Sequence, residues 1–277
     1  MAAARKPGMP FDYDAYGRAR AAFEKLPERL PEDTVRSVAR EVVQRLAERH
    51  RSEVLSSEPV DAVLTRLAHA LVDHTSDGGL SIVETLRDEG LQVREIYLCY
   101  LAGAAAKLGA WWVDDRLSFI DVSIGSARIF GLLHALRPYL GVVSRGEAQS
   151  ILLASVPGDM HTLGVAMAGD LLRDDGWDTR VLLSPTLDEI LEAVEAHPVR
   201  IVGLSLGSDM PLTEFLRTAT AVRVVAPGAA IVVGGAGAAR VREIAELASV
   251  DAIVSDLDEA KPVLRSLALE GEAGRAV

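Results

Sequence analysis

The sequence predicts an α/β protein in which an N-terminal helical bundle precedes a doubly wound sheet of five parallel strands. Apolar residues in the first half recur at helical spacing, and the chain changes character near residue 145. After that point short apolar runs alternate with amphipathic segments. Fully apolar short strands between helices are typical of a parallel sheet covered on both faces, and five of them in roughly 125 residues fit the flavodoxin type.

The first half is expected to form helices joined by short polar turns. In residues 31–55 the apolar positions Val35, Val38 and Val42 lie on one helical face. The further helices are expected at 60–72, at 81–87 with Gly90 beyond the end, at 93–112, and at 118–136 with Pro138 closing the last one. Residues 31–140 therefore read as a helical bundle that caps another domain, and residues 1–30 as an N-terminal arm or an extra helix.

The second half, residues 150–277, is predicted to be a Rossmann-like domain. Residues 141–149 are mostly polar, contain two glycines and are expected to link the two domains. Strands are expected at 151–156, 179–183, 200–206, 229–235 and 251–255. Helices are expected between and after them, at 163–173, 187–196, 212–222, 238–247 and 259–269.

Composition limits the function. A formal net charge of −11 argues against direct binding to nucleic acid or to an anionic membrane, both of which need a basic surface. The single cysteine, Cys99, lies in an apolar context and is expected to pack in a core. The N-terminus lacks the apolar centre of a signal peptide, and we expect no membrane span and a cytoplasmic location.

Three of the predicted strand ends carry unusual residues, and the first is followed by Asp159-Met160-His161-Thr162-Leu163-Gly164. A neutral imidazole is a good ligand for a transition metal, and a carboxylate two residues away can hold its other ring nitrogen. Thr162 is expected to cap the following helix, and Gly164 to let a bulky group approach its first turn.

The other two strand ends carry small residues. Ser205, Leu206 and Gly207 follow one of them and could line a cavity with a hydroxyl for a polar ligand tail. Gly234 and Gly235 follow the next and are expected to leave backbone amides bare beside a helix N-terminus. Each signal has a plain alternative, since a lone histidine is usually structural or solvated, and a glycine-rich loop serves tight turns or nucleotides equally well.

Together these residues resemble the cobalamin-binding signature DxHxxG…SxL…GG, over residues 150–270. The match runs through Asp159, His161 and Gly164, then Ser205 and Leu206, then Gly234 and Gly235, with Gly207 departing from the aliphatic third residue of SxL. The resemblance implies that His161 is the lower axial ligand of cobalt in base-off cobalamin, with Asp159 as its partner. Ser205 and the glycine pair would then hold the displaced nucleotide tail.

The helical half extends the resemblance. Residues 108–125 look like the hinge of a helical cap over the upper face of the corrin, which in light-sensing regulators carries a tryptophan and a Glu-His pair. Trp112 stands at the tryptophan position, whereas Val122 and Ser123 stand at those of the pair. Ordinary bundle packing remains the alternative reading of Trp111 and Trp112. Short segments of the sequence resemble AerR/PpaA-type regulators of photosynthesis genes, which act with a repressor protein as partner.

Four functions remain open at this stage. The chain is expected to be a cobalamin-binding transcriptional regulator, with light as one signal it could read, and not an enzyme. Adenosylcobalamin or hydroxocobalamin would be the cofactor in that case. The alternatives are a corrinoid methyl carrier of a methyltransferase system using methylcobalamin, a haem sensor on the same fold, and a mutase subunit.

Overall fold

The computed structural model describes residues 58–75, 78–141, 149–244 and 248–273. The chain divides into two compact units, Met1–Gly141 and Val142–Val277. Three expectations lie outside the described residues: the N-terminal arm of residues 1–30, the helix at 31–55, and nearly all of the linker at 141–149.

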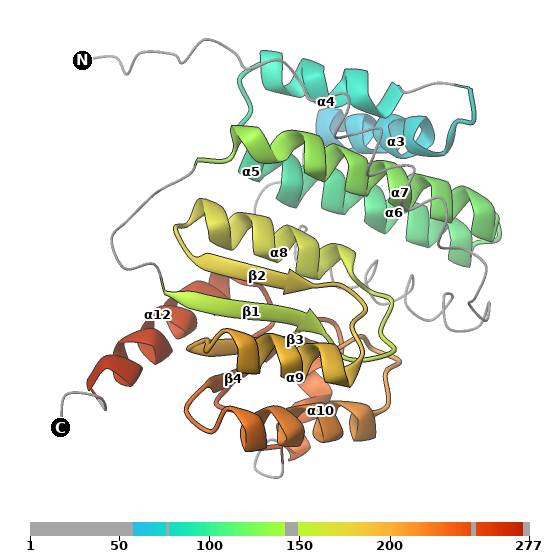
Figure 1. Ribbon diagram of the computed structural model, residues 1–277. Coiled ribbons are helices and arrows are strands. Elements are labelled where there is room, and N and C mark those ends of the chain that lie inside the picture. The colour runs from blue at the N-terminus through green and yellow to red at the C-terminus, as the bar shows by residue number, and fades with distance from the viewer. Residues whose placement is uncertain (1–57, 76–77, 142–148, 245–247, 274–277) are drawn as a thin grey trace, which may run out of the picture. The chain divides into compact units, whose positions relative to one another are not determined.

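The described part of the first unit is helical, as expected (Figure 1). Helices α3 (Glu58–Val72), α4 (Gly78–Asp88) and α7 (Phe119–Leu136) lie where the apolar periodicity predicts them, and the 3₁₀ turn η3 (Arg137–Tyr139) contains Pro138. The helix expected at 93–112 is instead built in three parts. These are α5 (Val93–Glu95), the π-helical turn η2 (Ile96–Leu101) and α6 (Ala102–Val113).

The core of the helical unit consists of the residues that the helical spacing places inward. Tyr97 is fully buried, and its hydroxyl donates to the carbonyl oxygen of Leu133 at 2.8 Å. This bond satisfies the polar end of a large buried ring and joins the π-helical turn to α7. The other largest fully buried side chains of the described part of this unit are Leu67, Leu71, Ile96, Leu101, Leu108, Ile129, Leu132, Leu133 and Leu136.

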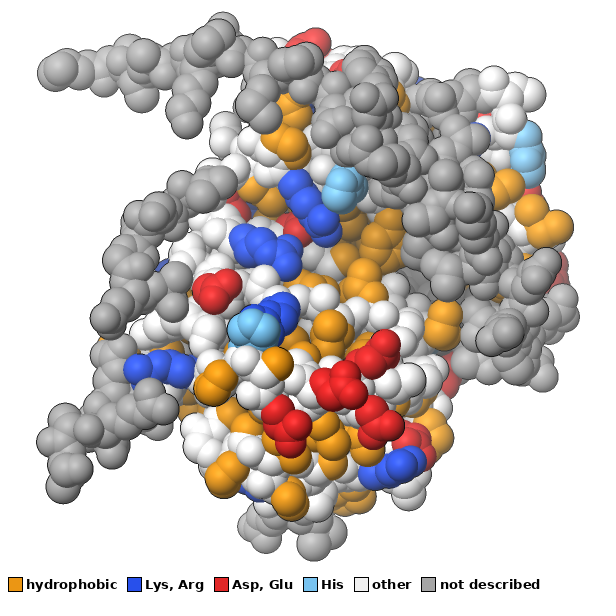
Figure 2. All heavy atoms as spheres, viewed as in Figure 1, with side chains coloured by type: hydrophobic (Ala, Val, Ile, Leu, Met, Phe, Trp, Pro, Cys, Tyr) orange, Lys and Arg blue, Asp and Glu red, His pale blue; other side chains and the backbone are white. Residues whose placement is uncertain are grey.

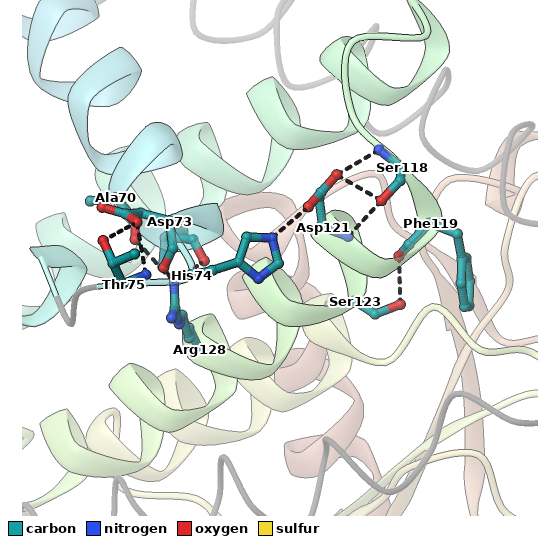
Figure 3. A network of polar contacts seen from close by, with 10 residues as sticks. Ala70, Asp73, His74, Thr75, Ser118, Phe119, Asp121, Ser123 and Arg128 are labelled. Atoms are coloured by element: carbon teal, nitrogen blue, oxygen red, sulfur yellow. Dashed lines mark hydrogen bonds and ion pairs between the residues drawn. The ribbon is translucent and has the colours of Figure 1, made fainter.

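Polar contacts join the end of α3 to α7 (Figure 3). Arg128 of α7 is buried, and its Nη1 donates to the carbonyl oxygens of Leu71 at 2.9 Å and Asp73 at 2.6 Å. These carbonyls end α3, so a cation there meets both their hydrogen-bonding capacity and the negative end of the helix dipole. His74 Nε2 lies 3.0 Å from Asp121 Oδ1 in the first turn of α7.

Asp121 also belongs to the capping box that begins α7. The Ser118 hydroxyl accepts from the Asp121 N–H at 3.2 Å, while the Asp121 carboxylate accepts from the Ser118 N–H at 2.8 Å. Hydrogen bonds from Ser118, and then the contact with His74, lower the pKa of Asp121 against the opposing effect of burial.

The second unit is a five-stranded, wholly parallel sheet in the order β2-β1-β3-β4-β5, which confirms the flavodoxin-like prediction (Figure 1). The strand order reverses between β1 and β3, the place where such sheets bind ligands. The strands are β1 (Ser150–Ser155), β2 (Asp178–Leu182), β3 (Ile201–Ser205), β4 (Ala230–Gly234) and β5 (Ala252–Ile253).

Helices alternate with these strands, and alternate strand residues supply two cores. Leu152 and Val202 belong to one core, with Phe215, whereas their neighbours Ile151 and Ile201 belong to the other. The helices are α8 (Leu163–Asp174), α9 (Leu187–Ala196), α10 (Leu212–Val225), α11 (Ala238–Val241) with the 3₁₀ turn η4 (Arg242–Ile244), and α12 (Leu257–Ala273). The helix expected at 238–247 therefore has only one α-helical turn before it tightens.

The outer face of α9 is acidic. Asp188, Glu189, Glu192 and Glu195 are all exposed, and the helix has no basic residue. Figure 2 shows acidic side chains gathered in the part of the surface where α9 lies. Glu189 also completes a capping box with Thr186, whose hydrogen bonds lower the pKa of this carboxyl.

Two described helical stretches are long and apolar enough to span a membrane, contrary to the expectation that none would be. They are Val93–Val113 and Phe119–Tyr139. Half of each apolar window is buried inside the protein, as in the core helices of soluble bundles, which satisfy the same length and composition criteria.

Candidate functional site

Three loops leave the carboxyl end of the sheet from adjacent strands. The register pairs Ser155 at the end of β1 with Ser205 at the end of β3, and Ser205 with Gly234 at the end of β4. The three groups of candidate site residues follow these three strands, so they meet at one edge of the sheet although they are far apart along the chain.

The centre of this edge is a hydrogen-bonded pair formed by Asp159 and His161. Asp159 is fully buried, and its Oδ1 contacts His161 Nδ1 in a short hydrogen bond. The same oxygen accepts from the His161 backbone N–H at 2.9 Å, and Oδ2 accepts from the Gly207 N–H at 2.6 Å. A buried carboxylate with these donors holds the imidazole as the Nδ1–H tautomer, which leaves Nε2 as the atom able to ligate a metal. The His161 side chain is 22% exposed.

Gly207 is the residue that allows the β3 loop to approach this pair. A Cβ atom on Gly207 would lie 2.8 Å from His161 Nδ1 and 2.9 Å from Asp159 Oδ2. Backbone and carboxylate could not keep their hydrogen bond with a side chain in that space. The departure from the SxL pattern at this position therefore has a steric reason in this chain.

The β4 loop packs in turn on the β3 loop. Gly235 has a φ of 92°, and a Cβ there would lie 2.8 Å from the Leu206 carbonyl oxygen and 2.9 Å from Ser205 Oγ. Gly237 is closer still, because its Cβ would meet the Gly207 carbonyl oxygen at 2.3 Å.

The sequence led us to expect that the backbone amides of the β4 loop would be free for a ligand, but two of them are already hydrogen-bonded within the protein. The Gly237 N–H donates to Leu206 O at 2.8 Å, and the Ala238 N–H donates to Gly235 O at 3.1 Å. These two donors fasten the loop to itself and to the β3 loop, so they are not offered to a ligand. The helix that follows, α11, is a single turn.

The expectation that Thr162 caps α8 through its side chain is wrong. Thr162 stands at the N-cap position, but its φ of −97° and ψ of −15° are helical, and its hydroxyl makes no capping bond. N-cap side chains reach back to the helix from an extended backbone, which this residue does not have. Gly164, two residues on, is exposed, and no atom lies within 4 Å of the place its Cβ would take.

Two serines hold the His161 loop and escaped the sequence analysis. The Ser184 N–H, after β2, donates to the buried Ser155 Oγ at 2.9 Å, and the Ser184 hydroxyl donates to the Asp159 carbonyl oxygen at 3.2 Å. Ser184 has a φ of 49°, which is unusual for a residue other than glycine. Neither serine is part of a known sequence motif. The only sequence signal for their role is that each lies at or just after the end of a predicted strand.

Arg240 is a further residue that the sequence did not single out. Its guanidinium Nη1 donates to the carbonyl oxygens of Ser208 and, at 3.0 Å, of Met210. These carbonyls lie just beyond Gly207, so Arg240 ties the short helix α11 to the β3 loop.

The two remaining predicted site residues belong to the first unit. Trp112 of α6 is buried, and Val122 of α7 is partly exposed. The ring of the neighbouring Trp111 lies 4.4 Å from that of His69 and 4.9 Å from the Arg116 guanidinium. Cys99 is half-buried, and burial and Glu95 raise the pKa of its thiol, as for a packing residue.

The donor set can be tested against a cofactor. The described residues include no group of three or more His, Cys, Asp or Glu side chains that could hold a metal ion. The site offers one imidazole nitrogen, with open space at Gly164, three residues beyond the partly exposed His161. Such a site fits a metal whose other ligands come from its own macrocycle.

Comparison with known proteins agrees with this geometry. Residues 149–264 match the family described as B12 binding domain. An uncharacterized 20.5 kDa protein in the bchF-crtJ intergenic region of Rhodobacter capsulatus is 33% identical over 111 residues, which are 39% of this chain and 58% of the relative. The chain thus spans less than two thirds of that relative.

One solved structure shows the same fold. The monomethylamine corrinoid protein of Methanosarcina barkeri superposes with a TM-score of 0.62 at 15% identity, over 75% of this chain and 99% of its own. A cobalamin-binding protein from Desulfitobacterium hafniense DCB-2 gives a TM-score of 0.40 at 17% identity, over 74% of this chain and 98% of its own. The match of residues 149–264 to the B12 binding domain family supports a cobalamin-type cofactor.

Proposed function

We propose that this chain is a cobalamin-binding regulator in which His161 Nε2 ligates cobalt from below. The observation that carries the proposal is the buried Asp159 carboxylate, which takes up Nδ1 of the imidazole and leaves Nε2 for the metal. Adenosylcobalamin, if bound, would supply a cobalt–carbon bond that light can cleave, whereas methylcobalamin would supply a methyl group for an acceptor.

The chain's own residues would bind and orient the group. Asp159 fixes the tautomer and ring orientation of His161, and Gly207 fixes Asp159 through its backbone N–H. Ser205, Leu206, Gly234 and Gly235 would border the nucleotide tail. Trp112 and Val122 would serve the upper ligand, with Thr162 and Gly164 near the lower face.

The regulatory part of the proposal rests on two supports. Short segments of the sequence resemble AerR/PpaA-type regulators. The similar Rhodobacter capsulatus protein is encoded in the bchF-crtJ intergenic region. A state change in the cofactor would shift the helical unit only through contacts that differ between the two states. The acidic balance favours a protein partner, such as a repressor, over direct contact with DNA.

Absorption spectroscopy of the purified full chain tests the cofactor. We expect adenosylcobalamin to give a base-off, His-on spectrum in the dark and an irreversible change on illumination. His161→Ala is expected to lose the His-on spectrum, whereas His197→Ala, at an exposed histidine after α9, should keep it. Equal spectra for His161→Ala and the unaltered chain would contradict the proposed ligand.

The same preparation separates regulator from carrier and haem sensor. A light-dependent change in hydrogen exchange of α6 and α7 would support a regulator. Methyl transfer to a thiol acceptor from the chain loaded instead with methylcobalamin, without a response to light, would identify a carrier, with which the fold similarity to a corrinoid protein is compatible. Stoichiometric haem binding without cobalamin binding would identify the haem sensor.

A further inference from the structure

Two exposed apolar side chains lie on neighbouring loops, one of which carries His161. Met160, which directly precedes the histidine, is 39% exposed, and Leu183, the first residue after β2, is 42% exposed. The register pairs Ala154 with Leu182, so the loops after β1 and β2 leave the sheet side by side.

Ser184 fastens these two loops together. Its N–H donates to Ser155 Oγ at 2.9 Å, and its hydroxyl donates to the Asp159 carbonyl oxygen at 3.2 Å. The hydroxyl also lies 3.6 Å from the Met160 sulfur. Three contacts from one residue, held at a φ of 49°, therefore fix where Met160 and Leu183 stand relative to His161.

Large apolar side chains exposed to water on the loop of a candidate metal ligand and on its neighbouring loop favour an apolar occupant. Isolated exposed apolar residues are ordinary, but neighbouring ones beside a polar anchor are typical of ligand sites. A thioether is polarisable and adapts to irregular surfaces. The underside of a corrin ring is broad and largely apolar, and it must face whatever surrounds the lower ligand.

We propose that Met160 and Leu183 form a shelf that contacts the cofactor ring when His161 ligates its metal, and that Ser184 is the positioning residue of this shelf. The inference rests on the proposed cobalamin function and assigns the residues that add apolar contact to the single axial bond.

Titration of the full chain with hydroxocobalamin, followed by absorption, tests the shelf. We expect Met160→Ser with Leu183→Ser to raise the Kd about tenfold or more, because both side chains lose apolar area that the ring would cover. The saturated His-on spectrum should not change, because His161 and Asp159 are intact. The matched control is Val224→Ser, an apolar residue of α10 that is 75% exposed, and its Kd should stay within about twofold of the unaltered chain.

Ser184→Gly separates positioning from folding. Glycine adopts a positive φ without strain, so the variant removes only the hydroxyl contacts. We expect an unchanged urea midpoint and a Kd raised about threefold, less than for the double variant. Should the double variant fail to fold, each single serine variant is expected to raise the Kd about threefold.

The outcomes are distinguishable. Tight binding by the double variant with the unaltered chain's Kd overturns the shelf alone. An equal loss in Val224→Ser also overturns it, because the effect would then not be local. Absence of any spectral change in the unaltered chain overturns the proposed function, and the shelf with it.

Discussion

At the scale of single residues, the backbone of Gly207 and the side chains of Asp159 and His161 form one unit. The amide of Gly207 supplies a hydrogen bond that a buried carboxylate needs, and the missing side chain makes room for it. Besides the imidazole, backbone N–H groups from two loops, those of His161 and Gly207, donate to the Asp159 carboxylate.

Gly207→Ala is expected to weaken cobalamin binding about tenfold or more. The added methyl would lie under 3.0 Å from His161 Nδ1 and must displace the imidazole or the β3 loop. Absorption titration measures the Kd. The matched control is Gly228→Ala, since nothing lies within 4 Å of that position, and its Kd should match that of the unaltered chain. Equal affinity of both variants would contradict the steric role of Gly207.

Gly164→Ala should separate binding from stability. The space at this exposed position is open, and alanine in a helix is about 0.5–1 kcal/mol more favourable than glycine. We therefore expect a higher urea midpoint together with weaker cobalamin binding, if the ring approaches the first turn of α8. A variant that is stabilised and still binds normally would place the cofactor elsewhere.

At the scale of elements, the helices of the first unit are tied by buried polar contacts that periodicity does not reveal. Helical spacing predicted where α3, α4 and α7 lie, because each has a continuous apolar face. It could not predict the π-helical turn at Ile96–Leu101, within which Tyr97 donates its hydroxyl hydrogen bond to the Leu133 carbonyl oxygen. Thr162 was misjudged for a similar reason, since residue type suggested a cap and the backbone did not adopt one.

Arg128→Met is expected to lower the free energy of unfolding by about 2–4 kcal/mol. The change retains an apolar stem but leaves the Leu71 and Asp73 carbonyls without their buried donor. Urea unfolding followed by circular dichroism measures the effect. Arg217→Met, on the exposed face of α10, is the matched control and should cost less than about 0.5 kcal/mol. A comparable loss in both variants would contradict the capping role.

The capping box of α7 should make the helical unit acid-sensitive. The pKa of Asp121 is lowered in the folded chain, so its carboxylate contributes stability above its ordinary pKa. This contribution is lost as the pH falls from the ordinary pKa through the lower folded pKa. We expect Asp121→Asn to reduce unfolding free energy at pH 7 and to flatten its decline in acid.

Urea titrations of both proteins between neutral and acidic pH measure this difference. Ser118→Ala should cost about 1 kcal/mol at pH 7, as removal of an N-cap hydroxyl usually does. Parallel pH curves for the unaltered chain and Asp121→Asn would show that this carboxyl does not contribute.

At the scale of the whole molecule, the sequence predicted the sheet well and the site in outline. Short, largely apolar runs identified all five strands, and the observed strand order is that of the flavodoxin type. That order brings Asp159, Ser205 and Gly234 to one edge. The contacts of Ser155, Ser184 and Arg240 arise from backbone carbonyls and hydroxyls, which no residue pattern encodes.

Cofactor binding should stabilise the second unit as a whole. A ligand present at 100 times its Kd adds about 2.7 kcal/mol if it binds only the folded state. We expect hydroxocobalamin to raise the urea midpoint of the full chain, measured by far-UV circular dichroism, and to raise it much less in His161→Ala. An identical increase in that variant would mean that the axial bond adds no affinity.

The stacking of the three loops has a consequence for any attempt to transplant this site. Gly237 packs against the Gly207 carbonyl, and Gly207 packs against Asp159 and His161. The position of each loop therefore depends on the absence of a side chain in the loop packed against it. A graft of the DxHxxG segment alone would arrive on a foreign β3 loop without the matching clearance. A chimaera that binds the cofactor must therefore receive the segments after β1, β3 and β4 together.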